Sequence, residues 1–225
     1  MNLTVRDLAE RLQESEKTIL RWVEDGLPSH EVNGQHHFNG AEFVEWASSR
    51  DIPIPPQLFG NDELSASVSG LPDALTAGGV YSDLKGTDKS SVLKSLVDVM
   101  RLPRGADREM MHHFLMAREE LESTGIGDGI AIPHARNPMV LHGARPMVAL
   151  GFLAQPVDFG AIDGKPVHTL FLVVSPTARA HLHLISRVAY ALKHEGFRRA
   201  VLAKESLETL LKEARQMEVD LRARK

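Results

Sequence analysis

The chain has 225 residues, a formal net charge of -4 and no cysteine. Charged residues at 25% and hydrophobic residues at 43% are ordinary globular values, so the composition excludes a largely disordered chain. The missing cysteines exclude disulfides, zinc-thiolate sites and cysteine nucleophiles. No apolar stretch approaches the length of a bilayer span, and residues 1–7 lack the start of a secretory signal. We therefore predict a cytoplasmic protein with no membrane insertion.

The first 51 residues predict a small domain with the order helix, turn, helix, hairpin, helix. Ser15 is suited to N-cap the second helix, because its hydroxyl can accept from a free backbone N–H. Asn33 and Gly34 both tolerate positive φ and so favour a tight hairpin turn. Asn39 and Glu42 have the spacing of a capping pair for the third helix. The expected elements are helices over residues 5–12 and 16–24, a hairpin around 32–35, and a helix that carries Phe43 and Trp46.

This arrangement resembles the winged helix-turn-helix of the excisionase and MerR families, on residues 3–12, 18–26 and 38–46. The resemblance implies duplex DNA as a partner, with Lys17, Thr18 and Arg21 of the second helix facing the major groove. The same 51 residues carry five basic and ten acidic side chains, a balance that opposes binding to phosphates. A protein-docking module therefore stays open as the alternative.

Residues 52–73 are rich in proline, serine and glycine and have no sustained periodicity, which indicates a linker. Beyond it, residues 74–220 predict a second domain that alternates amphipathic helices with short apolar strands. We expect an α/β domain in which helices flank a small mixed sheet. The expected helices cover residues 89–100, 107–121, 181–192 and 206–214, and the expected strands cover 129–132, 147–153 and 170–174.

The most informative segment is residues 123–136, where a glycine-rich turn leads into a short apolar strand that ends at Pro133 and His134. Proline removes a donor and fixes φ, so the histidine is expected to be held rigidly, with its ring facing solvent. A dinucleotide-binding reading of the glycines fails, because that motif needs a strand before them and a helix after them.

This segment closely resembles the active-site motif of phosphotransferase-system enzyme IIA, of the fructose and nitrogen-regulatory type. The resemblance extends over residues 75–217 and includes the motifs at 116–120, 157–164 and 181–186. It implies that His134 is phosphorylated, that Arg118 lies near the phosphate and that His181 is the second active-site histidine. It also implies an HPr-like phosphocarrier protein as the donor and no cofactor.

The residue types fit phosphoryl transfer. A neutral imidazole, with a reference pKa of about 6.5, offers a lone pair at cytoplasmic pH and forms a bond from which the group can be passed on. Arg118 can direct two donors at the equatorial oxygens, and His181 can add one. Thr124, Gly125 and Gly127 are expected to bind the phosphoryl group through the glycine turn. Where the family usually has glycine after the histidine, this chain has Ala135.

Several alternatives stay open. His183 competes with His181 for the second position, and the two lie on different helix faces, so we expect no shared metal. The pairs at residues 36–37 and 112–113 lack metal-ligand spacing and are expected at the surface. The function that we expect is a phosphocarrier coupled to regulation, through transcription or another unidentified target. Sugar transport with a separate permease, or a binding module without chemistry, are the other possibilities.

Overall fold

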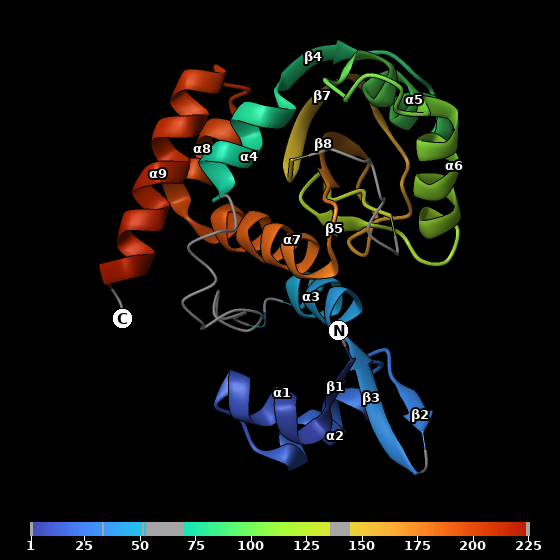
Figure 1. Ribbon diagram of the computed structural model, residues 1–225, viewed down its shortest axis with the longest axis vertical. Helices are drawn as coiled ribbons and strands as arrows, with labels where there is room; N and C mark the ends of the chain where they lie inside the picture. Colours follow the sequence, from blue (N-terminus) through green and yellow to red (C-terminus); the bar gives the residue numbers. More distant parts are fainter. Residues whose placement is uncertain (1, 33, 51, 53–69, 136–144, 224–225) are drawn as a thin grey trace. The chain divides into compact units, whose positions relative to one another are not determined.

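The computed structural model describes residues 2–32, 34–50, 52, 70–135 and 145–223 (Figure 1). The chain divides into two compact units, residues 1–67 and 68–225. Most of the predicted linker lies outside the described residues. Its last part does not, because a helix already begins at Leu71, before the predicted domain start at residue 74.

The first unit combines three helices with a three-stranded antiparallel sheet in the order β1-β3-β2. Thr4 caps the first helix and Ser15 the second, where the Thr18 backbone N–H donates to the Ser15 hydroxyl at 3.1 Å. Val32 pairs with Gln35 across the expected hairpin. The elements are β1 Asn2–Thr4, α1 Val5–Leu12, α2 Glu16–Glu24, β2 His30–Val32, β3 Gln35–Asn39 and α3 Gly40–Ser49.

A small aromatic core holds this unit together. The Trp22 ring lies 5.8 Å from that of Trp46 and 6.4 Å from that of Phe43, measured between centroids. Arg50 places its guanidinium 4.6 Å from the centroid of the Trp46 ring and also donates to the Asp25 carbonyl. The arginine thereby ties the end of α3 to the end of α2.

The second unit is built on a five-stranded mixed sheet in the order β4-β7-β8-β6-β5. β4 and β7 are parallel, as are β6 and β8, whereas β7–β8 and β5–β6 are antiparallel. The predicted mixed sheet flanked by helices is therefore confirmed. The elements are α4 Leu71–Gly78, β4 Val80–Leu84, α5 Lys89–Val99, α6 Arg108–Glu119, β5 Gly125–Gly127, β6 Ile130–Ala131, β7 Met147–Val157, β8 Val167–Val174, α7 Ala178–Lys193, α8 Glu195–Leu202 and α9 Leu207–Ala223.

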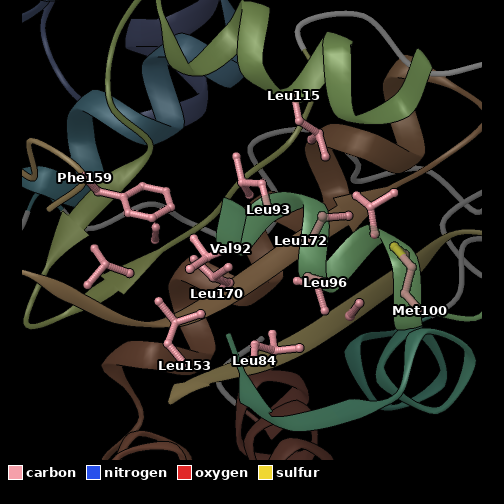
Figure 2. Close-up of a cluster of buried hydrophobic side chains, with 14 of the residues drawn as sticks. Leu84, Val92, Leu93, Leu96, Met100, Leu115, Leu153, Phe159, Leu170 and Leu172 are labelled. Carbon is pink, nitrogen blue, oxygen red and sulfur yellow. The ribbon is translucent and has the colours of Figure 1, made fainter. Parts of the chain in front are cut away.

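Alternation along β8 explains the layers. Leu170, Leu172 and Val174 enter a buried cluster with residues of α5 and α6, which Figure 2 shows in close-up. Phe171 points to the other face, where its ring lies 6.3 Å from that of Phe197 on α8. Helices therefore cover both faces of the sheet, and burial of these side chains supplies most of the stability.

The close approach of α4 to the sheet depends on a glycine. A methyl group on Gly78 would overlap the backbone carbonyl of Val148 on β7. At the start of the same helix, the Leu71 backbone N–H donates to Glu218 on α9 at 3.0 Å. The first and last helices of the second unit are thus joined directly.

Four elements of the second unit were not predicted: α4, β4, β5 and α8. The last helix is also longer than expected, since it reaches Ala223 rather than residue 214. α7 begins at Ala178, with Thr177 rather than a later residue as its N-cap.

Candidate functional site

His134 follows β6 after Ile132 and Pro133, and backbone contacts hold it in place. It forms an isolated parallel bridge with Val173 of β8, whose N–H donates to the Pro133 carbonyl at 3.0 Å. The Nδ1 atom of His134 lies 2.8 Å from the Ile132 carbonyl oxygen. A carbonyl oxygen only accepts, so Nδ1 carries the proton and the lone pair of the neutral ring lies on Nε2.

His181 packs its ring against that of His134. The two ring centroids lie 5.1 Å apart with an angle of 54° between the planes. The expectation that the His134 ring faces solvent is wrong, because only 2% of the residue is exposed and His181 is almost as buried. The Nε2 atom of His181 has no hydrogen-bond partner among the residues that the structure describes.

Both imidazoles are neutral at physiological pH. Burial and the nearby Arg118 charge lower the pKa of His134 to about 4, against opposing contributions from the Ile132 carbonyl and Glu119. Burial, followed by the electrostatic effects of His134 and Arg118, lowers the pKa of His181 to about 3. The neutral ring of His134 can act as a nucleophile and that of His181 as a hydrogen-bond donor. With the positive charge of Arg118 nearby, the site is suited to a dianion.

Arg118 reaches the site from the last turn of α6, where it is buried. Its Nη1 atom donates to the Glu122 carbonyl at 2.8 Å, which fixes the guanidinium just after the helix ends. The charge lies close enough to act on both histidines. The structure therefore brings together the three residues expected to share the site.

The predicted phosphate ligands of the glycine turn are placed differently. Thr124 directs both its N–H and its hydroxyl at Glu119, rather than toward His134. Gly125 and Gly127 form the edge strand β5, with Gly127 opposite Ile130 at the end of β6 away from His134. A methyl group on Gly125 would overlap Ala161. The described contacts of these residues are structural, and their contact with a phosphoryl group stays a prediction.

Glu119 is a site residue that the sequence did not single out. Its side chain is only 1% exposed, yet it is surrounded by donors from Thr124 and by the Lys89 ammonium at 3.5 Å. In the sequence, Glu119 is visible only as the residue after Arg118 at the end of a predicted helix. No local rule indicates that the Glu119 side chain turns inward.

The other histidines take separate places. His183 is buried on α7, but the ring contact with His134 is made by His181. His112 is half-buried rather than at the surface, because its Nε2 atom contacts the Ser90 carbonyl at 3.0 Å. Over the described part of the chain, no group of three or more His, Cys, Asp or Glu side chains is placed to hold a metal ion.

In the first unit, Lys17 and Arg21 are exposed on α2, on the side opposite the buried Ile19. Thr18 is half-buried, and its hydroxyl lies 2.9 Å from that of Ser15 in the N-cap. Two exposed acidic residues, Glu16 and Glu24, lie on the same helix.

Comparison with known proteins identifies the family. The family described as "Phosphoenolpyruvate-dependent sugar phosphotransferase system, EIIA 2" matches residues 74–214. The chain belongs to this EIIA family, and the match includes all three of the clustered residues.

Two curated relatives indicate the range of the family. A "Nitrogen regulatory protein" of Pseudomonas aeruginosa is 37% identical over 145 residues, 62% of this chain and 91% of that protein. A "PTS system fructose-specific EIIABC component" of Bacillus subtilis is 30% identical over 144 residues, 63% of this chain but only 22% of that protein. The solved structure of nitrogen regulatory protein IIA-Ntr from Neisseria meningitidis superposes with a TM-score of 0.53, at 23% identity, over 68% of this chain and 99% of that one. That likeness shows a shared fold.

None of the helices in the described part of the chain is long and apolar enough to cross a membrane.

Proposed function

We propose that this protein is a phosphocarrier that accepts a phosphoryl group on the Nε2 atom of His134 from an HPr-like phosphoprotein. The observation that carries the proposal is the hydrogen bond from His134 Nδ1 to the Ile132 carbonyl, which leaves the Nε2 lone pair as the nucleophile. Membership in the EIIA family supports the same chemistry.

The step needs no external base. The Nε2 lone pair forms the new N–P bond while the donor's N–P bond breaks and its nitrogen leaves with the electron pair. The phosphorylated imidazole keeps its Nδ1 proton, so its bond to Ile132 becomes charge-assisted. Arg118 is placed to neutralise the transferred group, and a proton on His181 Nε2 gives the buried ring a partner among the phosphoryl oxygens.

The test uses the full chain with the general phosphotransferase proteins and labelled phosphoenolpyruvate. We expect label on the wild type and none on His134→Ala, with His183→Ala as the matched control that stays labelled. Coupling of phosphorus to the Nε2 resonance of the ¹⁵N-labelled phosphoprotein would identify the atom. An unlabelled wild type, or coupling to Nδ1, would overturn the proposal.

We further propose that phosphorylation serves regulation rather than transport alone. The attached first unit supports this, as does the match over most of a relative named for nitrogen regulation. The phosphoryl group adds about two negative charges beside Arg118, which changes the surface that a target protein meets. Transfer to a separate sugar permease is the alternative, supported by the relative named for fructose.

Duplex DNA is the proposed partner of the first unit, read as a winged helix-turn-helix with α2 as the recognition helix and β2–β3 as the wing. The exposed Lys17 and Arg21 support it. We expect the full chain to retain a labelled mixed-sequence duplex at low salt, and Lys17→Ala with Arg21→Ala to abolish retention. Arg6→Ala with Arg11→Ala on α1 removes the same charge and is the control. If neither pair changes retention, or no duplex binds, the unit is a protein-docking module.

A further inference from the structure

Three hydrogen-bonded steps, joined through the backbone of Thr124 and Ile132, lead from Glu119 to the imidazole of His134. The Glu119 carboxylate accepts from the Thr124 hydroxyl at 2.6 Å and from its N–H at 3.1 Å. Thr124 in turn accepts on its carbonyl from the Ile132 N–H at 3.0 Å. The Ile132 carbonyl finally accepts from His134 Nδ1 at 2.8 Å.

We propose that Glu119 is a positioning residue for phosphoryl transfer, which acts through Thr124 and Ile132 to keep the proton of His134 on Nδ1 and the lone pair on Nε2. The proposal rests on the proposed function for its kinetic consequence. Its structural consequence, a single tautomer of His134, can be measured whether or not the protein is phosphorylated.

The chemistry explains why a carboxylate stands here. Both Thr124 groups are donors directed at Glu119, and the Lys89 ammonium approaches the same carboxylate at 3.5 Å. A glutamine would offer one oxygen instead of two and would point an amide N–H₂ at a donor. Burial of a charge is costly unless the charge is paired and hydrogen-bonded. Thr124 and Lys89 meet both conditions for the Glu119 carboxylate.

The position of these hydrogen bonds explains how Glu119 can influence His134. Thr124 precedes β5 and Ile132 follows β6, so the hydrogen bond between them joins the two strand ends just before the polypeptide reaches His134. If Thr124 is released from Glu119, the Ile132 carbonyl loses its fixed direction. The alternative tautomer, with the proton on Nε2, then becomes accessible and removes the nucleophile.

The test compares Glu119→Gln with Glu120→Gln, the exposed C-cap residue of the same helix, whose replacement changes the charge equally. Imidazole ¹⁵N shifts of His134 report the tautomer in the unphosphorylated full chain. We expect one protonated and one unprotonated nitrogen in the wild type and in Glu120→Gln, and averaged shifts in Glu119→Gln. The transfer rate should fall about tenfold in Glu119→Gln only, the equivalent of about 1.4 kcal/mol.

Thr124 provides the second arm. Thr124→Val removes the hydroxyl donor and should reproduce the averaged shifts, whereas Thr124→Ser keeps the donor and should restore the wild-type pattern. Combining Thr124→Val with Glu119→Gln should add little to either change, because both act on one path.

A wild-type tautomer pattern in Glu119→Gln overturns the proposal, as does additivity in the double variant. If Glu119→Gln does not fold, judged by circular dichroism, the Thr124→Val and Thr124→Ser pair decides. A wild type that takes no phosphate overturns the proposed function, and the tautomer measurement still decides the positioning role.

Discussion

The rings of His134 and His181 lie with their centroids 5.1 Å apart, although one residue follows a strand and the other lies in the first turns of a helix. The parallel bridge from His134 to Val173 places the first ring beside the end of β8, and the chain then turns directly into α7. The pair is thus a product of sheet order rather than of sequence proximity.

From this pairing we expect His181→Ala to slow phosphoryl transfer to His134 by about ten- to a hundredfold, because a hydrogen bond to a charged group contributes about 1.5–3 kcal/mol. Quenched-flow transfer from the phosphorylated donor measures the rate. His183→Ala is the control on the same helix. Equal rates in the two variants would exclude a role for His181.

The pH dependence of His134 follows from its lowered pKa. We expect its ring to titrate near pH 4, so the Nε2 lone pair stays available and the transfer rate varies little between pH 8 and about 5.5. Histidine Cε1–H resonances followed against pH provide the measurement. Titration near pH 6.5, the ordinary value, would show that the ring is solvated in solution.

Acid should destabilise the folded chain through the same group. An unfolded histidine has a pKa of about 6.5 and His134 has one of about 4, so between these values the unfolded chain binds more protons. The stability that depends on the neutral ring is complete above about pH 6.5 and is lost as the pH falls toward 4. In His134→Gln, the drop in unfolding free energy from pH 7 to 4.5 should be smaller by roughly 2 kcal/mol. Urea titrations measure it, and the exposed His113→Gln should keep the wild-type slope.

Packing of α4 on the sheet gives a prediction about stability. We expect Gly78→Ala to lower the unfolding free energy by about 3 kcal/mol, because the new methyl group meets the fixed backbone of Val148. Gly164→Ala is the comparison, since its φ is +67° and no atom lies near, so only about 1 kcal/mol of backbone strain is expected. Similar melting temperatures for both variants would contradict the close packing.

Local signals explain what the sequence predicted well. Ser15 caps its helix through groups in its own neighbourhood, and Pro133 fixes its own φ just before His134 regardless of the rest of the chain. β4 was missed because only Leu84 of its five residues is buried, and β5 because two of its three residues are glycines. α8 follows α7 after the single residue His194, so no loop signal separates the two helices.

Tertiary contacts decided the remainder of the site. The ring of His181 on α7 packs against that of His134, and the inward turn of Glu119 depends on donors from Thr124, just before β5, and from Lys89 on α5. Sequence motifs indicated His134 as the proposed reacting group and Arg118 as its cation, because phosphoryl transfer demands these residue types. The supporting hydrogen bonds depend on strand order, which the motifs do not encode.

The hydrogen bond between the Leu71 backbone and Glu218 has a consequence for how such a domain can be combined with others. It holds the first and last helices of the second unit next to each other. Another domain can therefore be fused at either end of this unit without disturbing its sheet. A domain whose two ends lie close together can be joined to different neighbouring domains. The same domain can then stand almost alone, as in the Pseudomonas relative, or occupy about a fifth of a much longer chain, as in the Bacillus one.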